Sequence, residues 1–452
     1  YKRQGLDGPY TQILIDSRPV FSALSGVYGL EQIPASMIER VEVMRGGGSA
    51  LFGSSAIAGT INIITKEPLR NSGQLSHTIT SLGGSSSFDN NTSLNASLVT
   101  DDHRAGLYIF GQNRYRSGYD YDGDGFTELP KLKNQTVGFR SYLKTSTYSK
   151  LTFEYHHMQE FRRGGDMLNR PPHEAHIAEQ LQHSIDGGSL KFDYFSPDEK
   201  NRLSVFASAA NTDRDSYYGP GNDPLKAYGK TTDLTAMGGA QYVHTFDKCF
   251  FMPSDLTAGL EYNRDRLKDN MWGYNRHTDQ TVNIYSAFLQ NEWKNDRWGI
   301  LIGGRLDKHN MVDNVIFSPR ANLRFNPTQN INLRLSYSSG FRAPQAFDED
   351  MHIENVGGTV AMIERAKDLK EEKSQSFSAS ADMYHRFGAF QTNLLIEGFY
   401  TRLTDVFVLG EPYDRGDGIL VKTRSNGPGA KVMGLTLEGK VAYLSILQIQ
   451  AG

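Results

Sequence analysis

Residues 38–65 read IERVEVMRGGGSALFGSSAIAGTINIIT and carry more information than any other stretch of the chain. Apolar and charged residues alternate from Ile38 to Met44, and this alternation predicts a strand. Three glycines follow, then a run of small residues, and then a second predicted strand over 60–65. Because glycine permits positive φ and close backbone approach, the stretch predicts a compact, tightly packed strand–turn–strand unit.

This stretch resembles the plug domain of TonB-dependent outer-membrane receptors, whose pattern is roughly IERIEVVRGPxSALYGxxAxGGVINIITK. The matching residues that we single out as the plug motif are Arg45, Gly46, Gly53 and Gly59. The chain departs from the pattern at Gly47 and Ala58, where the family has Pro and Gly, and neither departure adds bulk. Residues 13–19 also resemble the family's LIDGxP strand and turn, with Ser17 in place of Gly. A glycine-rich segment of a soluble fold is the alternative.

The composition fits a membrane barrel as well as a soluble protein. The chain has 452 residues, a net charge of −3 and 38% hydrophobic residues. No apolar run approaches the roughly 18 residues that a spanning helix needs. In a barrel only every second residue faces lipid, and the 24 Phe and 23 Tyr suit aromatic girdles at the membrane interfaces. The lone Cys249 excludes an intrachain disulfide framework, and the near-neutral charge gives no reason to expect a nucleic-acid partner.

The chain divides into a predicted plug over 1–68 and a predicted barrel over 69–452. In the second part, period-2 segments recur, for example Leu333, Leu335 and Tyr337 alternating with polar residues. The resemblance implies an all-β transmembrane fold, with the N-terminal plug domain inside an antiparallel 22-stranded β-barrel. It also implies that both ends are truncated, so that the TonB box and the last strands lie outside this chain. The expected location is the outer membrane of a Gram-negative bacterium.

The lengths of the segments between strands predict the topology. Short turns such as 325–330 are expected on the periplasmic side. The predicted extracellular loops are 156–188, 211–234, 264–282, 342–374 and 404–431. Binding residues often lie in such loops, which a rigid scaffold holds in position.

An acidic motif lies within Asp120–Glu128, DYDGDGFTE. Carboxylates at positions 1, 3, 5 and 9 with Gly at position 6 are typical of a loop that wraps Ca²⁺ in oxygen ligands. Position 12 is Lys131 instead of the Glu of an EF-hand, so the motif is incomplete. We expect a structural Ca²⁺ there, with a solvated acidic turn as the alternative, and no cofactor is otherwise required. The candidate ligands are Asp120, Asp122, Asp124 and Glu128.

A third motif, residues 339–344 (SGFRAP), resembles the FRAP box of haem, corrinoid and siderophore receptors. In the family this box ends a strand and opens a long extracellular loop, and residues 367–374 resemble the partner motif that follows. Haem receptors commonly place an axial His between the two boxes. The candidate substrate-binding residues of this loop are therefore Asp348, Asp350 and His352. The alternative is a surface histidine beside carboxylates.

Histidines gather in the stretch 173–183, HEAHIAEQLQH, which could form a short helix after two prolines. His173, His176 and His183 then fall near one face and are candidate ligands for a transition metal or haem. Solvated loop histidines are the alternative. The spacing is not HExxH, so a metalloprotease is poorly supported.

Residues 20–29, VFSALSGVYG, follow the first predicted plug strand. In the family, the equivalent plug loops form the floor of the substrate site. The resemblance therefore makes candidates of Phe21, Ser22, Ser25 and Tyr28. Packing inside the plug is the alternative.

No nucleophile–His–acid grouping, P-loop or dinucleotide motif stands out, so an enzyme is not expected. The resemblance implies active import of a scarce metal chelate, an iron–siderophore or haem, ahead of a corrinoid. An oligosaccharide importer, which would add a surface lipoprotein partner, and a soluble calcium-binding β protein are the alternatives. The implied partners are TonB with its inner-membrane energising complex, the chelate and the lipid bilayer.

Overall fold

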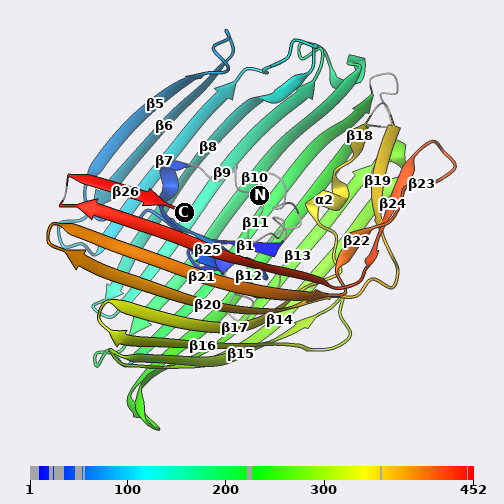
Figure 1. Cartoon of the computed structure of the whole chain (residues 1–452). Helices are drawn as coiled ribbons and strands as arrows, with labels where there is room; N and C mark the ends of the chain where they lie inside the picture. The colour runs from blue at the N-terminus through cyan, green and yellow to red at the C-terminus, as the bar shows by residue number, and fades with distance from the viewer. Residues whose placement is uncertain are drawn as a thin grey trace.

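The computed structural model describes residues 10–19, 24, 35–45, 53, 56–220, 227–356, 359–444 and 446–452. A small N-terminal sheet lies inside a wall of long antiparallel strands, and a second small sheet lies at one end of that wall (Figure 1). Within these residues, every helix is too short or too polar to cross a membrane.

Among the described residues, the N-terminal sheet has four strands in the order β2-β1-β4-β3. Their bounds are β1 (Thr11–Ile15), β2 (Arg18–Pro19), β3 (Ile38–Arg45) and β4 (Gly59–Thr65), and the 3-10 helix η2 (Ala35–Met37) precedes β3. Strand β4 pairs in parallel with β1 and antiparallel with β3, and six of its seven residues are buried. Both strands predicted within 38–65 are therefore present, and the apolar one forms the centre of this plug sheet.

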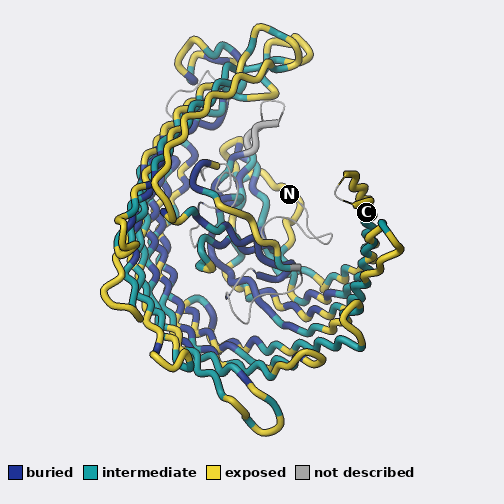
Figure 2. Tube along the Cα trace, turned by 90° about the vertical axis from the view of Figure 1, so that its left-hand side faces the viewer, coloured by how far each residue is buried: buried dark blue, intermediate teal, exposed yellow. Residues whose placement is uncertain are grey.

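In the described part of the chain, the wall contains seventeen strands, each antiparallel to its neighbour in the sequence. Figure 2 shows the wall curving around the plug sheet. The count of 22 strands that the resemblance implies for a whole receptor stays a prediction. The bounds are β5 (Ser72–Ser81), β6 (Phe88–Val99), β7 (Ala105–Arg116), β8 (Thr127–Ser146), β9 (Ser149–Gly165), β10 (Ile177–Phe195), β11 (Asn201–Pro220), β12 (Tyr228–Cys249), β13 (Met252–Met271), β14 (Arg276–Lys294), β15 (Trp298–His309), β16 (Ile316–Thr328), β17 (Ile331–Arg342), β20 (Glu372–Phe387), β21 (Phe390–Thr404), β25 (Ala430–Tyr443) and β26 (Leu447–Ala451).

The predicted alternation separates the two faces of the wall. Outward-facing Leu260, Ile302 and Leu435 are 65%, 57% and 76% exposed, whereas inward-facing Asp265 and Arg305 are buried. An apolar outer band over a polar interior is the arrangement that a bilayer requires of a barrel. The period-2 pattern therefore predicted the wall correctly.

The two ends of the wall differ. At one end, which we call the turn end, strands join through short turns such as 147–148, 250–251 and 388–389. Exposed aromatic residues beside these turns suit an interfacial girdle, and they include Tyr148, Phe250, Trp298, Phe387 and Phe390. The opposite end carries the longer connections, and we call it the loop end. In outer-membrane barrels the longer loops face the outside.

The predicted extracellular loops are partly wrong. Much of 156–188, 211–234 and 264–282 is strand, because β9 to β14 extend as paired hairpins towards the loop end. The remaining two predicted loops, 342–374 and 404–431, form a sheet of their own, in which β19 and β24 pair in parallel. Its strands are β18 (Glu354–Val356), β19 (Thr359–Arg365), β22 (Phe407–Leu409), β23 (Tyr413–Asp414) and β24 (Leu420–Asn426). The short helices of the loop end are η3 (Pro172–Glu174), η4 (Trp272–Tyr274) and α2 (Asp348–Met351).

Candidate functional site

Helix α2 lies inside the loop end, where its carboxylates meet arginines from other elements. Arg214 of β11 donates to Asp348 over 2.8 Å, and Arg424 of β24 lies 2.9 Å from Asp350. Arg276 of β14 donates to two backbone carbonyls of the α2 segment, over 3.4 Å and 2.9 Å. All five of these side chains are buried. The structure thus brings Asp348 and Asp350 together with partners inside the protein, and their contact with a substrate stays a prediction.

The FRAP-like motif ends β17, as the resemblance implies, and joins three parts of the molecule. The Arg342 guanidinium lies 4.1 Å from the ring centroid of Phe347 and 5.7 Å from that of Tyr10 in the plug. Arg342 is also opposite Glu372 of β20 in the ladder, and the Tyr10 hydroxyl donates to Glu372 over 2.8 Å. The motif therefore couples the plug to the wall and to the segment that carries α2.

A cluster of buried side chains, the loop-end cluster, joins the hairpins of β9–β14 to the small sheet. The hydroxyl of Tyr274 donates to the Tyr218 carbonyl over 2.7 Å, and the Tyr217 and Tyr228 rings meet edge to face at 4.9 Å. His352, just after α2, packs edge to face on Tyr218 at 5.2 Å. The buried members are Ala175, Ala178, Leu181, Tyr217, Tyr218, Ala227, Met271, Tyr274, Ile353, Met362 and Ile419.

Arg163 of β9 adds a positive charge beside this cluster. It is 1% exposed, donates to the carbonyls of Gly164 and Asp166, and interacts electrostatically with the Asp166 carboxylate and with Tyr217 and Tyr228. Its Nε has no hydrogen-bond partner, and no carboxylate of the described chain lies close enough to form an ion pair with it. Aromatic rings beside a guanidinium that keeps an unused N–H suit an anionic aromatic ligand.

The helix predicted over 173–183 is wrong. Strand β10 begins at Ile177 and pairs with both β9 and β11, because its cross-strand partners outweigh the local helical spacing. His173 is held by the Tyr228 hydroxyl (2.9 Å), and His176 by Asp166 (2.6 Å). His183 is buried within β10, six residues after the first residue of the strand and therefore about 20 Å along it. The three histidines therefore do not share one face, and their role as metal ligands lacks the geometry on which it was predicted.

The acidic motif at 120–128 lies at the loop end, in the connection between β7 and β8 and the first two residues of β8. One ligand atom from each of Asp120, Asp122, Asp124 and Glu128 lies within 4.8 Å of all the others. Asp120 also accepts hydrogen bonds from the N–H groups of Gly123 (2.7 Å) and Gly125 (2.9 Å), which curls the loop around the carboxylates. Their convergence agrees with the calcium-loop pattern, and calcium binding stays a prediction.

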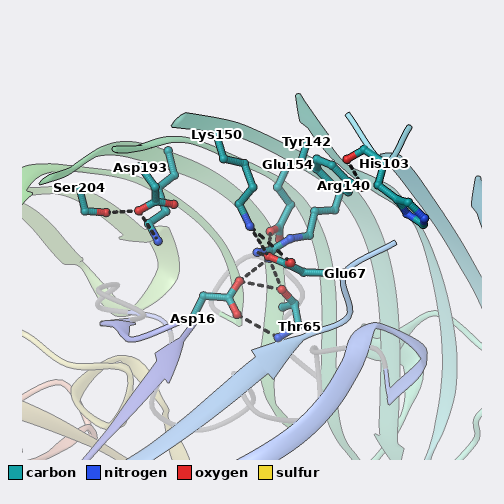
Figure 3. A network of polar contacts seen from close by, with 11 residues as sticks. Asp16, Thr65, Glu67, His103, Arg140, Tyr142, Lys150, Glu154, Asp193 and Ser204 are labelled. Atoms are coloured by element: carbon teal, nitrogen blue, oxygen red, sulfur yellow. Dashed lines mark hydrogen bonds and ion pairs between the residues drawn. The ribbon is translucent and has the colours of Figure 1, made fainter. Parts of the chain in front are cut away.

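The plug meets the wall through the polar network in Figure 3. Asp16, in the turn after β1, accepts hydrogen bonds from the Thr65 N–H (2.9 Å) and hydroxyl (2.6 Å). Arg140 of β8 donates to both Asp16 and Thr65 and lies 3.2 Å from Glu154 of β9. A single wall arginine therefore ties two plug strands to two wall strands.

The plug motif is only partly described. Gly53 and Gly59 have φ of +80° and +135°, which favours glycine, and a Cβ at Gly53 would lie 3.3 Å from the Arg305 guanidinium. The backbone of Arg45 ends β3. The predicted residues that lie outside the described part of the chain are Gly46, Phe21, Ser22, Ser25 and Tyr28.

Burial and neighbouring charges shift the pKa values of the carboxyl groups of the site in different directions. For Asp16, burial raises the pKa, but Arg140 and the Thr65 hydrogen bonds outweigh it and bring the pKa below 3.8. Burial also raises the pKa of Asp166, and the hydrogen bond from His176 helps to bring it below 3.8. For Asp350, burial dominates and raises the pKa above 3.8, against the lowering effect of Arg424. The Asp350 carboxyl therefore takes up a proton more readily than Asp16.

Sequence reasoning missed the arginines that organise this site. Arg140, Arg163 and Arg214 occupy inward-facing positions of long strands, where a barrel interior is expected to be polar anyway. The sequence can reveal a charged residue at such a position. It cannot reveal the partner of that residue, because Arg214 and Asp348 are 134 residues apart in the sequence.

Two family models match the chain. The model "TonB dependent receptor-like, beta-barrel" covers residues 62–452, and "TonB-dependent Receptor Plug Domain" covers residues 1–60.

Two curated relatives illustrate the sequence similarity. The "Vitamin B12 transporter BtuB" of Vibrio vulnificus is 23% identical over 362 residues, which cover 76% of this chain and 54% of that protein. The "Iron-regulated outer membrane virulence protein" of Vibrio cholerae is 27% identical over 363 residues, which cover 76% and 51%. The chain spans about half the length of these curated relatives.

Solved structures share the fold. The siderophore receptor PirA from Acinetobacter baumannii superposes with a TM-score of 0.79 at 19% identity, covering 98% of this chain and 71% of that one. A variant of the ferric enterobactin receptor PfeA from Pseudomonas aeruginosa, in complex with enterobactin, gives 0.78 at 19% identity, covering 99% and 73%. At these identities the likeness concerns the arrangement of the backbone.

Proposed function

This chain belongs to the TonB-dependent receptors, proteins of the Gram-negative outer membrane, and on that premise we propose that it imports an iron–siderophore chelate with energy supplied through TonB. The family consists of receptors and transporters, so no catalytic reaction is assigned to the chain.

The observation that carries this proposal is the combination of tyrosines and an arginine with an unused N–H at the loop end. Tyr217, Tyr218 and Tyr274 are buried in the loop-end cluster, and the Nε of Arg163 beside it has no hydrogen-bond partner, although the Asp166 carboxylate acts on this arginine at a distance. Aromatic rings stack on aromatic ligands, and a guanidinium in a dry environment attracts anionic oxygens strongly. A siderophore with catecholate-type groups offers both features. The structurally similar proteins named as siderophore and ferric enterobactin receptors point the same way.

The histidines favour a siderophore over haem. A siderophore surrounds its iron with its own oxygens, whereas haem in a receptor gains from an axial protein ligand. His173 and His176 are engaged with Tyr228 and Asp166, and His352 packs on Tyr218. In the described part of the chain, the acidic loop is the only group of three or more such side chains that converges as for a metal.

Substrate capture and passage follow from the two sets of contacts. The chelate displaces the loops that cover the loop-end cluster and binds between the tyrosines and Arg163. The motif that contains Arg342 connects the loop end to Tyr10 of the plug. A conformational change at the loop end is therefore transmitted to the plug. TonB then pulls on the plug, and the Asp16–Arg140 contact is one of those that must break.

A corrinoid is the second candidate, because one relative is named as a vitamin B12 transporter. The two are separated by uptake in a Gram-negative strain that lacks its own siderophore and corrinoid receptors, with and without TonB. The receptor that contains this chain should take up radiolabelled ferric enterobactin only when TonB is present. Uptake of cyanocobalamin without iron uptake would establish the corrinoid alternative instead.

Binding of the chelate to the same cells tests the role of Arg163. Arg163→Gln removes the charge and should weaken chelate binding to whole cells about tenfold, the effect of losing one charge-assisted hydrogen bond. The matched control is Arg104→Gln, an exposed arginine in a turn-end connection. Equal binding by both variants would contradict a role for Arg163.

A further inference from the structure

A cavity of about 340 Å³ lies between the plug and the inner face of the wall, away from the loop-end cluster. Met44 of plug strand β3 lines it on one side, and strands β14–β17, β20 and β21 line it on the other. Strand β3 is the edge of the plug sheet and leaves Val41 and Val43 51% and 52% exposed. The described residues of the plug therefore leave space beside this part of the wall.

Three arginines dominate the lining. Arg320 and Arg324 are on the same face of β16, and Arg334 of β17 stands directly opposite Arg324 in the ladder. No carboxylate of the described chain forms an ion pair with any of the three. Glu292 is the acidic residue of the lining and acts on Arg320 only at a distance. Lys294, also in the lining, is already paired with Asp255 over 2.6 Å.

The hydrogen bonds of these arginines leave their charge uncompensated. Arg324 donates to the carbonyls of Asn295 (2.8 Å) and Trp298 (3.4 Å), and Arg334 to the side-chain oxygen of Asn332 (2.8 Å). The Nη1 of Arg320 is buried and has no partner. Neutral oxygens satisfy donors, but they do not cancel positive charge.

Such an arrangement costs stability. Like charges directly opposite each other on neighbouring strands are destabilising. Gly299 lies beside Arg324, and a Cβ there would come within 3.1 Å of its Nε, so glycine keeps the space that the guanidinium occupies. Elsewhere in the barrel, arginines lie beside carboxylates, as Arg305 does beside Glu261 of β13 and Asp307 of its own strand. In the cavity, by contrast, the half-buried Arg324 and the exposed Arg334 have no ion-pair partner in the described part of the chain.

Hydroxyl groups complete the lining. Ser336 and Ser338 of β17 and Ser378 of β20 lie beside the arginines, together with Ser376 and Thr401, which hydrogen-bond to each other over 3.0 Å. Hydroxyls and guanidinium groups are donors to the oxygens of carboxylates and catecholates. The lining therefore has the chemistry of a site for an oxygen-rich anion.

We infer that this cavity is a transit subsite, where Arg320, Arg324 and Arg334 hold the anionic oxygens of the chelate after it leaves the loop end and before it passes the edge of the plug. This inference rests on the proposed function for the identity of the anion. The anion-binding chemistry of the cavity itself does not depend on it.

The test uses the double variant Arg324→Gln/Arg334→Gln in the receptor that contains this chain, with Arg104→Gln as control. Ferric enterobactin should bind to whole cells with unchanged affinity, because the loop end is intact, and its TonB-dependent uptake should fall about tenfold. Binding and uptake that both match those of the control would overturn the subsite.

A second measurement is independent of the substrate. Inorganic phosphate should raise the midpoint of thermal unfolding of the purified wild-type receptor and of the control, but not that of the double variant. An equal shift in all three would contradict anion binding in the cavity. If the wild type takes up no ferric siderophore at all, the proposed function fails, and the phosphate shift alone then decides whether the cavity binds anions.

Discussion

Two groups of arginines inside the barrel are treated in opposite ways. At the loop end, Arg214 and Arg424 meet the carboxylates of α2 at 2.8 Å and 2.9 Å. In the cavity beside the plug, Arg324 and Arg334 face each other, and neither forms an ion pair with a carboxylate of the residues that the structure describes. We call the first pair the loop-end arginines and the second the cavity arginines. Arginine side chains thus stabilise the structure at the loop end, whereas in the cavity they remain available to bind an anion.

The difference indicates where a ligand's charge is needed. A buried guanidinium with a carboxylate partner is neutralised by the protein, and removing either partner leaves an uncompensated charge. A guanidinium without one attracts a mobile anion. The predictions below alter one group or the other.

The largest effect is expected when a loop-end pair is broken. Asp350→Ala removes the shorter of the two carboxylate contacts of the buried Arg424 and leaves it Glu349 at 3.4 Å. Removing one partner of a buried pair typically costs about 3–5 kcal/mol, and because Glu349 remains we expect the lower end of that range. The substitution also removes the acceptor for the Phe347 N–H at the start of α2. Hydrogen exchange in residues 347–353 and 420–426 should therefore accelerate strongly. The exposed pair Arg415–Asp417 provides the control, because Asp417→Ala should change these rates little. Equal rates in wild type and Asp350→Ala would show that the pair does not hold the segment.

The acidic loop extends the comparison to negative charges, since its four carboxylates converge within 4.8 Å. If Ca²⁺ binds with the affinity of extracellular modules, Kd is about 10⁻⁴–10⁻³ M. At about 100 times Kd it should stabilise the receptor by about 2.7 kcal/mol. Calorimetric titration with CaCl₂ measures the Kd from which this stabilisation follows. The double variant Asp122→Asn/Asp124→Asn should abolish the heat of binding. A titration that is flat for the wild type would leave a solvated acidic turn.

A smaller effect is expected when the cavity is made to resemble the loop end. Ser336→Asp places a carboxylate opposite Asn322, between Arg320 and Arg324 on the neighbouring strand. Relief of repulsion should stabilise the wall by about 0.2–1 kcal/mol, while chelate uptake falls because the arginines are neutralised. Ser336→Asn, of similar size and no charge, should leave both quantities near wild type. Loss of uptake in both variants would point to crowding of the cavity instead of charge.

The smallest effect is expected from pH, where Asp16 and Asp350 should respond with opposite sign. Folding lowers the pKa of Asp16 below 3.8, so its contribution is present above 3.8 and is lost as the pH falls through the lowered value. Folding raises the pKa of Asp350, so its contribution is present below 3.8 and is lost as the pH rises through the raised value.

Acidification should therefore loosen β1 and β4 of the plug while helix α2 is retained. Hydrogen exchange of residues 11–16 and 59–65, compared with residues 347–353 over a pH series, measures this. Asp16→Asn should remove the dependence in the plug. Parallel responses of the two regions would contradict the assigned directions.

Much of the fold was predictable because it depends on local pattern. The alternation over 38–44 and the apolar run 60–65 became β3 and β4, and period-2 segments became the wall. Prediction failed where pairing partners decide the outcome. The stretch 173–183 has helical spacing of its histidines, but pairing with β9 and β11 on either side makes a strand of it from Ile177 onward.

The candidate site was less predictable. The sequence singled out Asp348, Asp350 and His352 as a group, and the structure places them in one segment of the loop end. It could not reveal that Arg214 and Arg424 meet the two aspartates, because the packing of α2 against β11 and β24 at the loop end creates that contact. For the same reason, nothing in the sequence distinguished Arg324 and Arg334 from the many other inward-facing charges.

By itself, the sequence determined the family, the plug motif and the apolar and polar faces of the wall, because these depend on residue type at fixed short spacing. Only the tertiary structure decided which charges are neutralised, which histidines are engaged and where a cavity remains. Those properties depend on side chains that come within a few ångströms of each other from strands far apart in the chain, and electrostatic energy falls off with that distance rather than with separation in sequence.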